Sequence, residues 1–532
     1  MASLRDRFGF GGGSSLGSLG LIGVAMMMLA ASAPGLSAAV VRGVVFDDRN
    51  GNGVRDADES GLARVGVSNG VDVILTDDAG HYELPLSGAG EATLFVIKPR
   101  GWRPPVNEWN LPQFYRRVKT ADAATSLAAV DFPLIRSEEP DAFRAWVLTD
   151  PQPYAPQDVD YLARTVVARL AERREADFGI TLGDVTNDRA DLYAPVNTVM
   201  ARAGVPWYNL NGNHDLNLGA SDDRSSVVSF EAVYGPSTYA FHHGRVLFVA
   251  LNNVRFLGGL RYIGGLREDQ FAFLENVLRT TPRDELVVLL MHIPWFYPNP
   301  SNAETFRVAD RARLFALLRD RPNVFWLSGH THYQRHVFYG PADGWEGAQP
   351  LHEYNVAAAS GSFWGGPRDA NGIPLATMWD GTPHGYALLS FDGTKPPVTE
   401  YRAAREAPDY QIGLYAPETV APRLGYVSFF ANVFNGHDGW KIEARVDDRV
   451  FGEMRRVLEW DPAYAKLYLA QDTLPVPFPG RRLPDPTVCY HLWRGYLPVD
   501  LALGAHTLEV RATDPSGKSF VSRRTFQIVE AK

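Results

Sequence analysis

The sequence predicts a layered α/β or αββα domain placed between two small all-β domains. In residues 139–404, apolar runs of strand length alternate with runs that repeat at helical spacing, which is typical of layered α/β folds. On either side, residues 40–138 and 405–532 show short alternating runs separated by turn residues, which is typical of β-sandwiches. We therefore expect a fold class of α/β with a β domain at each end.

Length, composition and charge are those of a soluble protein with several domains. The chain has 532 residues, 45% of them hydrophobic and 21% charged. A net charge of −9 gives no basic surface for nucleic acid, so we expect no nucleic-acid partner. With Cys489 as the single cysteine, an intrachain disulfide and a thiolate metal site are both excluded.

Residues 1–39 have the pattern of a secretory signal peptide. Arg5 and Arg7 precede an apolar run at 19–31, which is shorter than the roughly 20 residues that a membrane-spanning helix needs. Small residues at 37–39 place the cleavage site near Ala39. We expect a periplasmic or secreted protein without a stable membrane span; an uncleaved anchor is the alternative.

The N-terminal β domain contains a calcium-type loop between two strand-like runs. Its ligand positions 1, 3, 5, 7, 9 and 12 fit the pattern, with Gly53 at position 6. These positions are Asp48, Asn50, Asn52, Val54 (through its carbonyl), Asp56 and Glu59. The sequence predicts a structural calcium ion here, and the alternative is an Asn/Gly-rich turn with solvated acids.

Polar residues follow the apolar runs of the central region, where strands are expected to end. They are Asp150 and Gln152 after 145–149, Asp184 after 178–182, Asn213, His214 and Asp215 after 205–210, Asn252 and Asn253 after 246–251, His292 after 286–291, and His330 and His332 after 324–327. Ligands of α/β sheets bind outside the carboxyl ends of the strands, so these side chains can converge there. Each alone fits a helix cap or a turn, but together they favour a divalent metal site.

The ordered motifs Asp150-x-Gln152, Gly183-Asp184, Gly212-Asn-His-Asp215, His292 and Gly329-His-x-His332 resemble those of the calcineurin-like metallophosphoesterase family. The resemblance covers residues 139–404 and implies an αββα metallophosphoesterase sandwich. The flanking regions resemble the extra β domains of some bacterial secreted members. As cofactors the resemblance implies two divalent transition metals, Mn, Fe or Zn.

The resemblance also assigns roles to the motif residues. Asp150, Gln152, Asp184 and His332 would hold one metal, and Asp184 with Asn213, His292 and His330 would hold the other. His214 would be the catalytic histidine that assists the leaving group, with Asp215 or Asp188 orienting its ring. Gln152 is a departure, since the family usually has histidine there, and it leaves the identity of the metal open.

The expected activity is hydrolysis of a phosphate monoester or diester, in a small-molecule or envelope substrate, by water activated at the dinuclear metal centre. Besides Asn213, we assign Trp364, His384 and Tyr386 to the substrate pocket, because they lie on loops rich in Gly and aromatic residues. Ordinary packing is the alternative for these three. The alternative function is a non-catalytic cell-envelope binding protein on a retained phosphoesterase scaffold.

Overall fold

The computed structural model describes residues 39–86, 91–119, 129–295, 305–421, 426–476, 478 and 481–530. Apart from Ala39, the expected signal peptide lies outside the described residues and stays a prediction. In the part of the chain that is described, no helix has both the length and the apolar character to cross a membrane.

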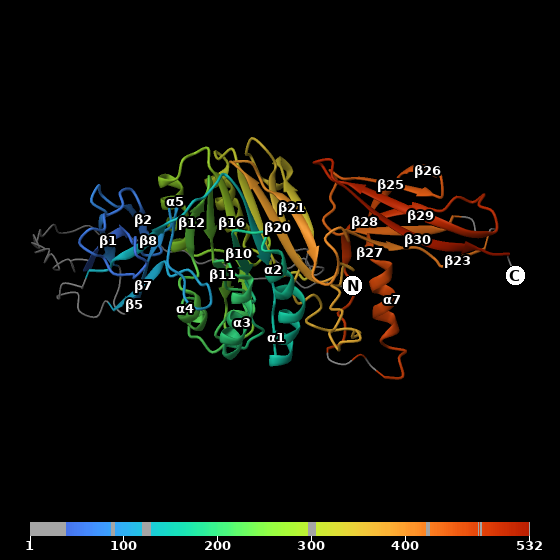
Figure 1. The fold of residues 1–532 in the computed structure, drawn as a ribbon, viewed down its shortest axis with the longest axis horizontal. Coiled ribbons are helices and arrows are strands. Elements are labelled where there is room, and N and C mark those ends of the chain that lie inside the picture. The colour runs from blue at the N-terminus through green and yellow to red at the C-terminus, as the bar shows by residue number, and fades with distance from the viewer. Residues whose placement is uncertain are drawn as a thin grey trace, which may run out of the picture. The chain divides into compact units, whose positions relative to one another are not determined.

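The central region consists of two sheets of strands (Figure 1). The first has the order β11 (Trp207–Leu210), β10 (Phe178–Leu182), β9 (Ala142–Leu148), β20 (Gly385–Asp392) and β21 (Val398–Ala403). The second has the order β12 (Tyr239–His243), β13 (Val246–Ala250), β16 (Leu286–Leu290), β17 (Val324–Ser328), β19 (Leu351–Asn355) and β18 (Arg335–Tyr339). A short hairpin pairs β14 (Val254–Phe256) with β15 (Tyr262–Gly264).

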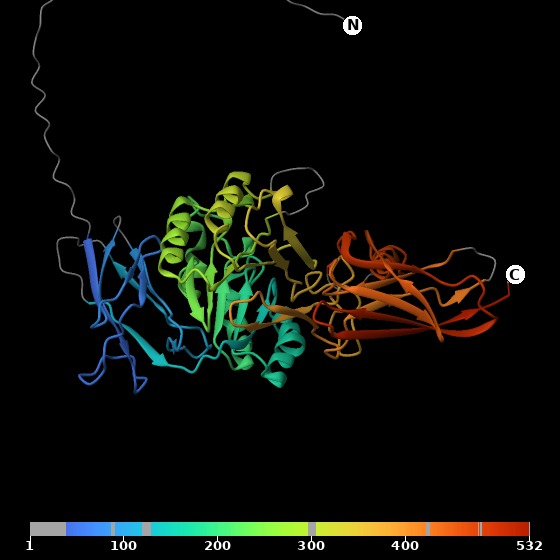
Figure 2. The ribbon, with the colours of Figure 1, turned by 90° about the horizontal axis from the view of Figure 1, so that it is seen from above.

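The helices lie outside the strands (Figure 2). They are α1 (Pro156–Leu162), α2 (Ala168–Arg173), α3 (Tyr193–Met200), α4 (Val228–Tyr234), α5 (Glu268–Thr280) and α6 (Val308–Leu318). A π-helical turn, Ala163–Val167, joins α1 to α2.

The side chains of β9 point alternately to the two faces of the first sheet and show what packs on each face. Trp146 and Leu148 pack with residues of α1, α2 and α3 on one face of the first sheet. Ala145 and Val147 belong to the core shared with the second sheet, to which α5 and α6 also contribute. The predicted αββα sandwich is thus confirmed, because successive residues of a strand point to opposite faces and both faces are apolar.

The N-terminal region forms two four-stranded sheets. One has the order β4 (His81–Leu86), β1 (Ala39–Asp47), β8 (Phe132–Arg136) and β6 (Trp102–Arg103). The other has the order β3 (Val73–Leu75), β2 (Gly66–Ser68), β5 (Glu91–Ile97) and β7 (Tyr115–Lys119). The buried Lys98, just past β5, pairs with Glu139 at 2.5 Å and so ties this region to the start of the sandwich.

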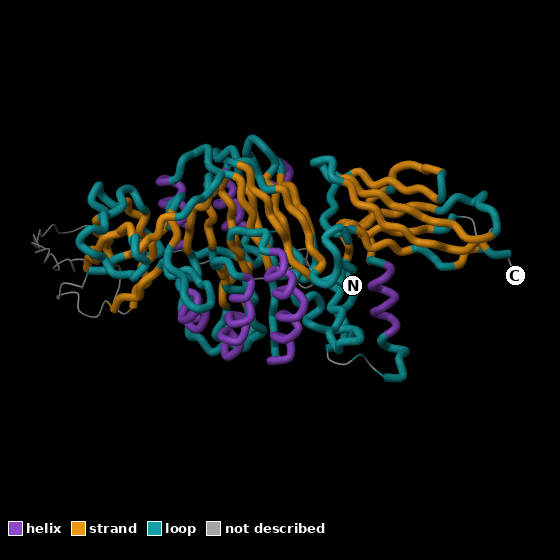
Figure 3. The backbone as a smooth tube through the Cα atoms, in the orientation of Figure 1, coloured by secondary structure: helices purple, strands orange, loops and turns teal. Residues whose placement is uncertain are grey.

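The C-terminal region is built from two further sheets and α7 (Pro462–Ala470), as Figure 3 shows. The first has the order β22 (Ile412–Tyr415), β24 (Ser428–Val433), β28 (Val488–Tyr496) and β27 (Arg455–Trp460). The second has the order β23 (Thr419–Val420), β30 (Ser519–Ile528), β29 (Gly504–Thr513), β25 (Lys441–Val446) and β26 (Arg449–Glu453). The all-β character predicted for both ends of the chain agrees with these sheets, whereas the exact domain boundaries stay predictions.

A buried polar network joins the C-terminal region to the loop that contains His332. Asp380 accepts a hydrogen bond from the backbone N–H of Gln334 at 2.9 Å and contacts Nε2 of His491, on β28, at 3.0 Å. Nearby, the indole N–H of Trp379 donates to the Thr331 carbonyl at 2.8 Å. Because these buried groups are paired with one another, the network fixes the loop.

Candidate metal centre

The candidate metal ligands lie at one edge of the paired sheets, directly after the strands. β9, β10 and β11 are parallel neighbours in the first sheet, as are β16 and β17 in the second, so within each sheet their carboxyl ends share one edge. The loops that follow bond to one another: the N–H of Asp150 donates to the Gly183 carbonyl at 3.2 Å, and the N–H of Gly329 to the His292 carbonyl at 2.9 Å. This places the predicted residues side by side, as the strand ends indicated.

Asp184 lies at the centre of this group and is 1% exposed. Its Oδ1 accepts the backbone N–H of His214 at 2.8 Å, and its Oδ2 lies 3.4 Å from Nε2 of His292. The Gln152 amide also donates to Oδ2. Burial alone would raise the pKa of Asp184, but His292 and His214 beside it outweigh burial and lower the pKa.

Two histidines are held so that Nε2 faces carboxylate and amide oxygens. Nδ1 of His292 donates to the Leu182 carbonyl at 2.8 Å, and Nδ1 of His332 to the Gly361 carbonyl at 2.6 Å. Their Nε2 atoms lie 3.1 Å from Oδ1 of Asn213 and 3.5 Å from Oδ1 of Asp150, respectively. An Nδ1–H bonded to a backbone carbonyl leaves Nε2 as the metal-binding atom, which is the usual arrangement of ligating histidines.

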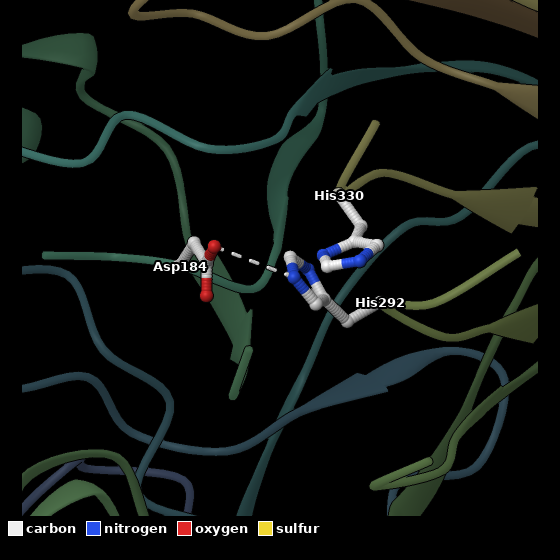
Figure 4. A group of neighbouring side chains, drawn as sticks. All are labelled: Asp184, His292 and His330. Atoms are coloured by element: carbon white, nitrogen blue, oxygen red, sulfur yellow. Dashed lines mark ion pairs between the residues drawn. The ribbon is translucent and has the colours of Figure 1, made fainter. Parts of the chain in front are cut away.

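His330 completes one cluster, drawn in Figure 4. Asp184, His292 and His330 each offer a ligand atom, and these atoms lie within 4.8 Å of one another. Burial, aided by His292, lowers the pKa of His330 to about 3, whereas Asp184 outweighs burial and raises the pKa of His292 to about 9.

Two buried oxygens of the group lack hydrogen-bond donors. Among the described residues, Oδ1 of Asp150 and Oε1 of Gln152 have no hydrogen-bond partner. A buried acceptor without a donor is costly, about 1–3 kcal/mol, and more when it is charged. A cation bound between these oxygens and the Nε2 atoms would satisfy them, so the residues present fit divalent metal.

The backbone of five of these residues is left-handed, which is rare for residues other than glycine. The φ angles are 50° at Asp150, 40° at Gln152, 52° at Asp184, 73° at His330 and 52° at His332. Such conformations cost about 1–3 kcal/mol each and cluster at functional sites. Close approach also requires glycine beside them: a Cβ on Gly212 would lie 2.1 Å from Oδ1 of Asp184.

His214 has Asp188 as its partner, which the sequence left open between Asp188 and Asp215. Nδ1 of His214 lies 3.0 Å from Oδ2 of Asp188. Burial acts to lower the pKa of His214, but Asp184 and Asp188 outweigh it and raise that pKa to about 9. The His214 side chain is 29% exposed, so it also faces solvent.

Asp215, the other residue expected to orient the catalytic His214, has different surroundings. Its carboxylate accepts the backbone N–H groups of Gly212 at 2.8 Å and Val185 at 3.1 Å, together with the Tyr193 hydroxyl at 3.1 Å. Burial, followed by Asp184, raises the pKa of Asp215 to about 7. The structure thus places Asp215 as a support of the two ligand loops and not beside the His214 ring.

The three residues Trp364, His384 and Tyr386, predicted to line the substrate pocket, are buried. Trp364, His384 and Tyr386 are 4%, 1% and 1% exposed. The Trp364 indole donates to the Pro151 carbonyl at 2.9 Å, and Nδ1 of His384 donates to the Ala359 carbonyl at 3.0 Å. Their burial favours the packing alternative, and Trp364 also holds the loop between Asp150 and Gln152, while substrate contact by these three residues stays a prediction.

Sequence reasoning missed three residues beside the centre. The Phe363 ring lies 4.3 Å from the His332 ring, and Tyr154 follows Gln152 by two positions. The guanidinium carbon of Arg481, from the C-terminal region, lies 5.6 Å from the Phe363 ring centroid. The loop containing Phe363 was noticed for its aromatic content, but nothing in the sequence connects Arg481 to it.

The calcium-type loop is ordered by its own side chains. Asp48, which is fully buried, accepts the backbone N–H groups of Asn52 at 3.1 Å and Gly53 at 3.0 Å. Glu59 accepts those of Arg49 at 2.9 Å and Asp56 at 3.1 Å. Two of the predicted ligand positions, Asp48 and Glu59, therefore point into the loop, and a bound calcium ion there stays a prediction.

Comparison with known proteins gives three matches to protein families. The chain matches the N terminal of calcineurin-like phosphoesterase at residues 49–136, calcineurin-like phosphoesterase at 143–334, and the C terminal of calcineurin-like phosphoesterase at 353–520. All the candidate metal ligands lie in the second segment.

Among solved structures, the chain is similar to a purple acid phosphatase isolated from seeds of yellow lupin (Lupinus luteus). The two share 13% identity and a TM-score of 0.35 over 69% of this chain and 68% of that one. None of the curated proteins compared matches the chain.

Proposed function

Because this chain belongs to the calcineurin-like phosphoesterase family, whose N-terminal, catalytic and C-terminal segments it carries in order, we propose that it hydrolyses a phosphate monoester or diester with two divalent metal ions. One ion would be held by Asp150, Gln152, Asp184 and His332, and the other by Asp184, Asn213, His292 and His330. When bound, such a pair polarises a phosphoryl oxygen and lowers the pKa of a water molecule.

The protein side chains supply orientation and a proton. Backbone carbonyls hold the His292 and His332 rings through Nδ1, so that Nε2 points toward the oxygens of the site. Asp188 holds Nδ1 of His214 in the same way, which leaves Nε2 of His214 to donate its proton to the leaving oxygen. Asp215 keeps the loops of Asp184 and His214 together through backbone N–H groups.

One observation carries the proposal: buried acceptor atoms without donors converge with imidazole nitrogens around a single carboxylate. The test is hydrolysis of p-nitrophenyl phosphate and bis(p-nitrophenyl) phosphate by metal-stripped protein, with Mn²⁺, Zn²⁺ or Fe²⁺ added back. We expect turnover of at least one substrate only after metal addition. No turnover with any metal would favour the alternative of a non-catalytic envelope-binding protein.

Replacement of Gln152 by histidine is expected to strengthen the first metal site. A neutral amide oxygen binds zinc and iron more weakly than imidazole does, and the first site has one unshared imidazole while the second has two. We expect Gln152→His to tighten the weaker of two metal-binding events about tenfold and to shift its preference toward zinc. Calorimetric titration and anomalous scattering measure affinity and position. Gln157→His, on the exposed start of α1, is the control, and two equally tight wild-type sites would contradict the asymmetry.

For the loop at residues 48–59 we propose a structural calcium ion without a role in hydrolysis. Millimolar Ca²⁺ should raise Tm by about 2–4 °C for each kcal/mol of binding free energy, and Glu59→Ala should remove this rise. Turnover should be unchanged. Melting in Ca²⁺ and in EDTA separates ion binding from the loss of the two backbone bonds that Glu59 accepts. Asp58→Ala, an exposed neighbour, should keep the calcium effect; no effect of Ca²⁺ on the wild type would reduce the loop to an ordinary turn.

A further inference from the structure

The segment from Arg481 to Leu483 in the C-terminal region is held closely against the catalytic region. Leu483 is 2% exposed, and its backbone N–H donates to Oε1 of Gln471 at 3.0 Å. Glycines face the segment on the other side. A Cβ on Gly365 would lie 3.1 Å from the Arg481 carbonyl oxygen, and one on Gly366 would lie 3.2 Å from the Leu483 side chain. The Arg481 side chain therefore starts from a defined position beside the catalytic loops.

The guanidinium of Arg481 lies over two aromatic rings next to the metal centre. Its central carbon is 5.3 Å from the ring centroid of Tyr154 and 5.6 Å from that of Phe363. The Phe363 ring packs on the imidazole of His332, a candidate metal ligand, at 4.3 Å. Tyr154 is 52% exposed, so the rings and the cation stand where the centre meets solvent.

Arg481 differs from the arginines around it in that its charge is not used by a neighbouring acid. Within the described residues, no carboxylate lies within the 4.0 Å that defines an ion pair with it. The next residue, Arg482, pairs with Asp472, and Arg189, which also lies near the Tyr154 ring, pairs with Asp191 at 2.7 Å. The protein as a whole has a net charge of −9, so an unpaired cation at this place offsets repulsion of an anionic substrate.

A cation–π contact with the aromatic rings occupies none of the guanidinium N–H groups, and among the described residues these groups donate no hydrogen bond. Two parallel N–H groups match the two oxygens of a phosphate or a carboxylate. We propose that Arg481 is a specificity-determining residue that binds a second oxyanion, in the organic part of a substrate whose scissile phosphate lies at the metal centre. This inference rests on the proposed phosphoesterase function and adds the substrate class, namely phosphoesters that carry a further anionic group.

The kinetic test compares esters that differ only in the distal group. Propyl phosphate, 3-(phosphooxy)propanoate and propane-1,3-diol bisphosphate are hydrolysed by metal-loaded protein, with released phosphate as the readout. We expect the wild type to prefer the esters with a distal anion. Arg481→Ala should lower that preference in kcat/KM about tenfold or more, mainly through KM, because a charge-assisted pair of hydrogen bonds is lost. Arg481→Lys keeps the charge but lacks the two parallel N–H groups, so its preference should lie between those of the wild type and Arg481→Ala. Comparing the carboxylate with the phosphate identifies which oxyanion is favoured.

The matched control is Arg482→Ala, which removes the same charge from the adjacent residue but lies over Tyr468 at 5.4 Å, on α7. It should leave the preference at its wild-type value. Calorimetric titration with the non-hydrolysable propylphosphonate and propane-1,3-bisphosphonate gives a readout that does not need turnover. If the wild type released no phosphate but bound the bisphosphonate through Arg481, the proposed function alone would be wrong. Equal effects of Arg481→Ala and Arg482→Ala, or no wild-type preference for the bisphosphonate, would overturn the inference.

Discussion

Asp184→Ala is expected to abolish hydrolysis and to empty at least one metal site while the fold persists. Asp184 is the carboxylate around which the other candidate ligands lie, with Nε2 of His292 at 3.4 Å. Loss of a metal that stabilises transition-state charge removes several kcal/mol, which corresponds to a fall in kcat of about 10³-fold or more. Elemental analysis of metal content, together with kcat and circular dichroism, measures the three expectations.

The left-handed backbone at this position, with φ of 52°, calls for a second variant. Alanine tolerates this conformation less well than aspartate, so Asp184→Ala changes both the ligand and the backbone strain. Asparagine tolerates it and removes only the charge, and Asp184→Asn should therefore lose activity with a smaller loss of stability. Asp191→Ala, at an exposed carboxylate paired with Arg189, is the matched control and should stay active. Near wild-type turnover by either Asp184 variant would exclude a metal mechanism that depends on this carboxylate.

The sandwich could be predicted because its strands are buried on both sides. β10 reads Phe-Gly-Ile-Thr-Leu and is buried along its whole length, which gives a short apolar run that stands out between helical segments. The candidate ligands could be located for a related reason. Within each sheet, parallel topology brings the residues that follow the strands to one edge, and the packing of the two sheets then places Asp184, after β10, beside His292, after β16.

Contacts that depend on loop conformation could not be predicted. Asp215 is adjacent to His214 in the sequence and Asp188 lies 26 residues earlier, yet the carboxylate that contacts the ring is that of Asp188, whose backbone is left-handed with φ of 55°. The aromatic content of a loop likewise does not distinguish a tryptophan that is buried, as Trp364 is, from one that lines a pocket, because aromatic residues occur in both settings. Arg481 lies far along the chain from Tyr154, and the close approach of its segment to Gly365 and Gly366 depends on the tertiary structure.

His214→Ala is expected to keep the metals and to lose rate, chiefly with poor leaving groups. Its ring is oriented by Asp188 at 3.0 Å, and its pKa is raised to about 9, so it carries a proton at neutral pH. Proton donation to a leaving oxygen contributes about 10²–10⁴-fold, and this contribution shrinks when the leaving group is already a weak base. A series of aryl phosphates with leaving-group pKa values from low to high measures the dependence on the leaving group. A loss that is equal along the series would assign His214 to charge stabilisation, and loss of metal would make it a ligand.

Asp188→Asn tests how much of the rate depends on the orientation of the His214 ring, because it keeps the imidazole that donates the proton. Asp188 is a positioning residue with a side chain that is 33% exposed, and an exposed charged pair is worth up to about 1 kcal/mol, or roughly fivefold in rate. The pH profile gives a readout that a merely structural role would not change. Asp188 raises the pKa of His214, so its removal lowers that pKa, and the protonated form is lost at a lower pH. The alkaline limb of kcat should therefore move to lower pH in Asp188→Asn and disappear in His214→Ala. An alkaline limb that stays at the same pH in both variants would show that another group titrates there and that His214 is not the proton donor.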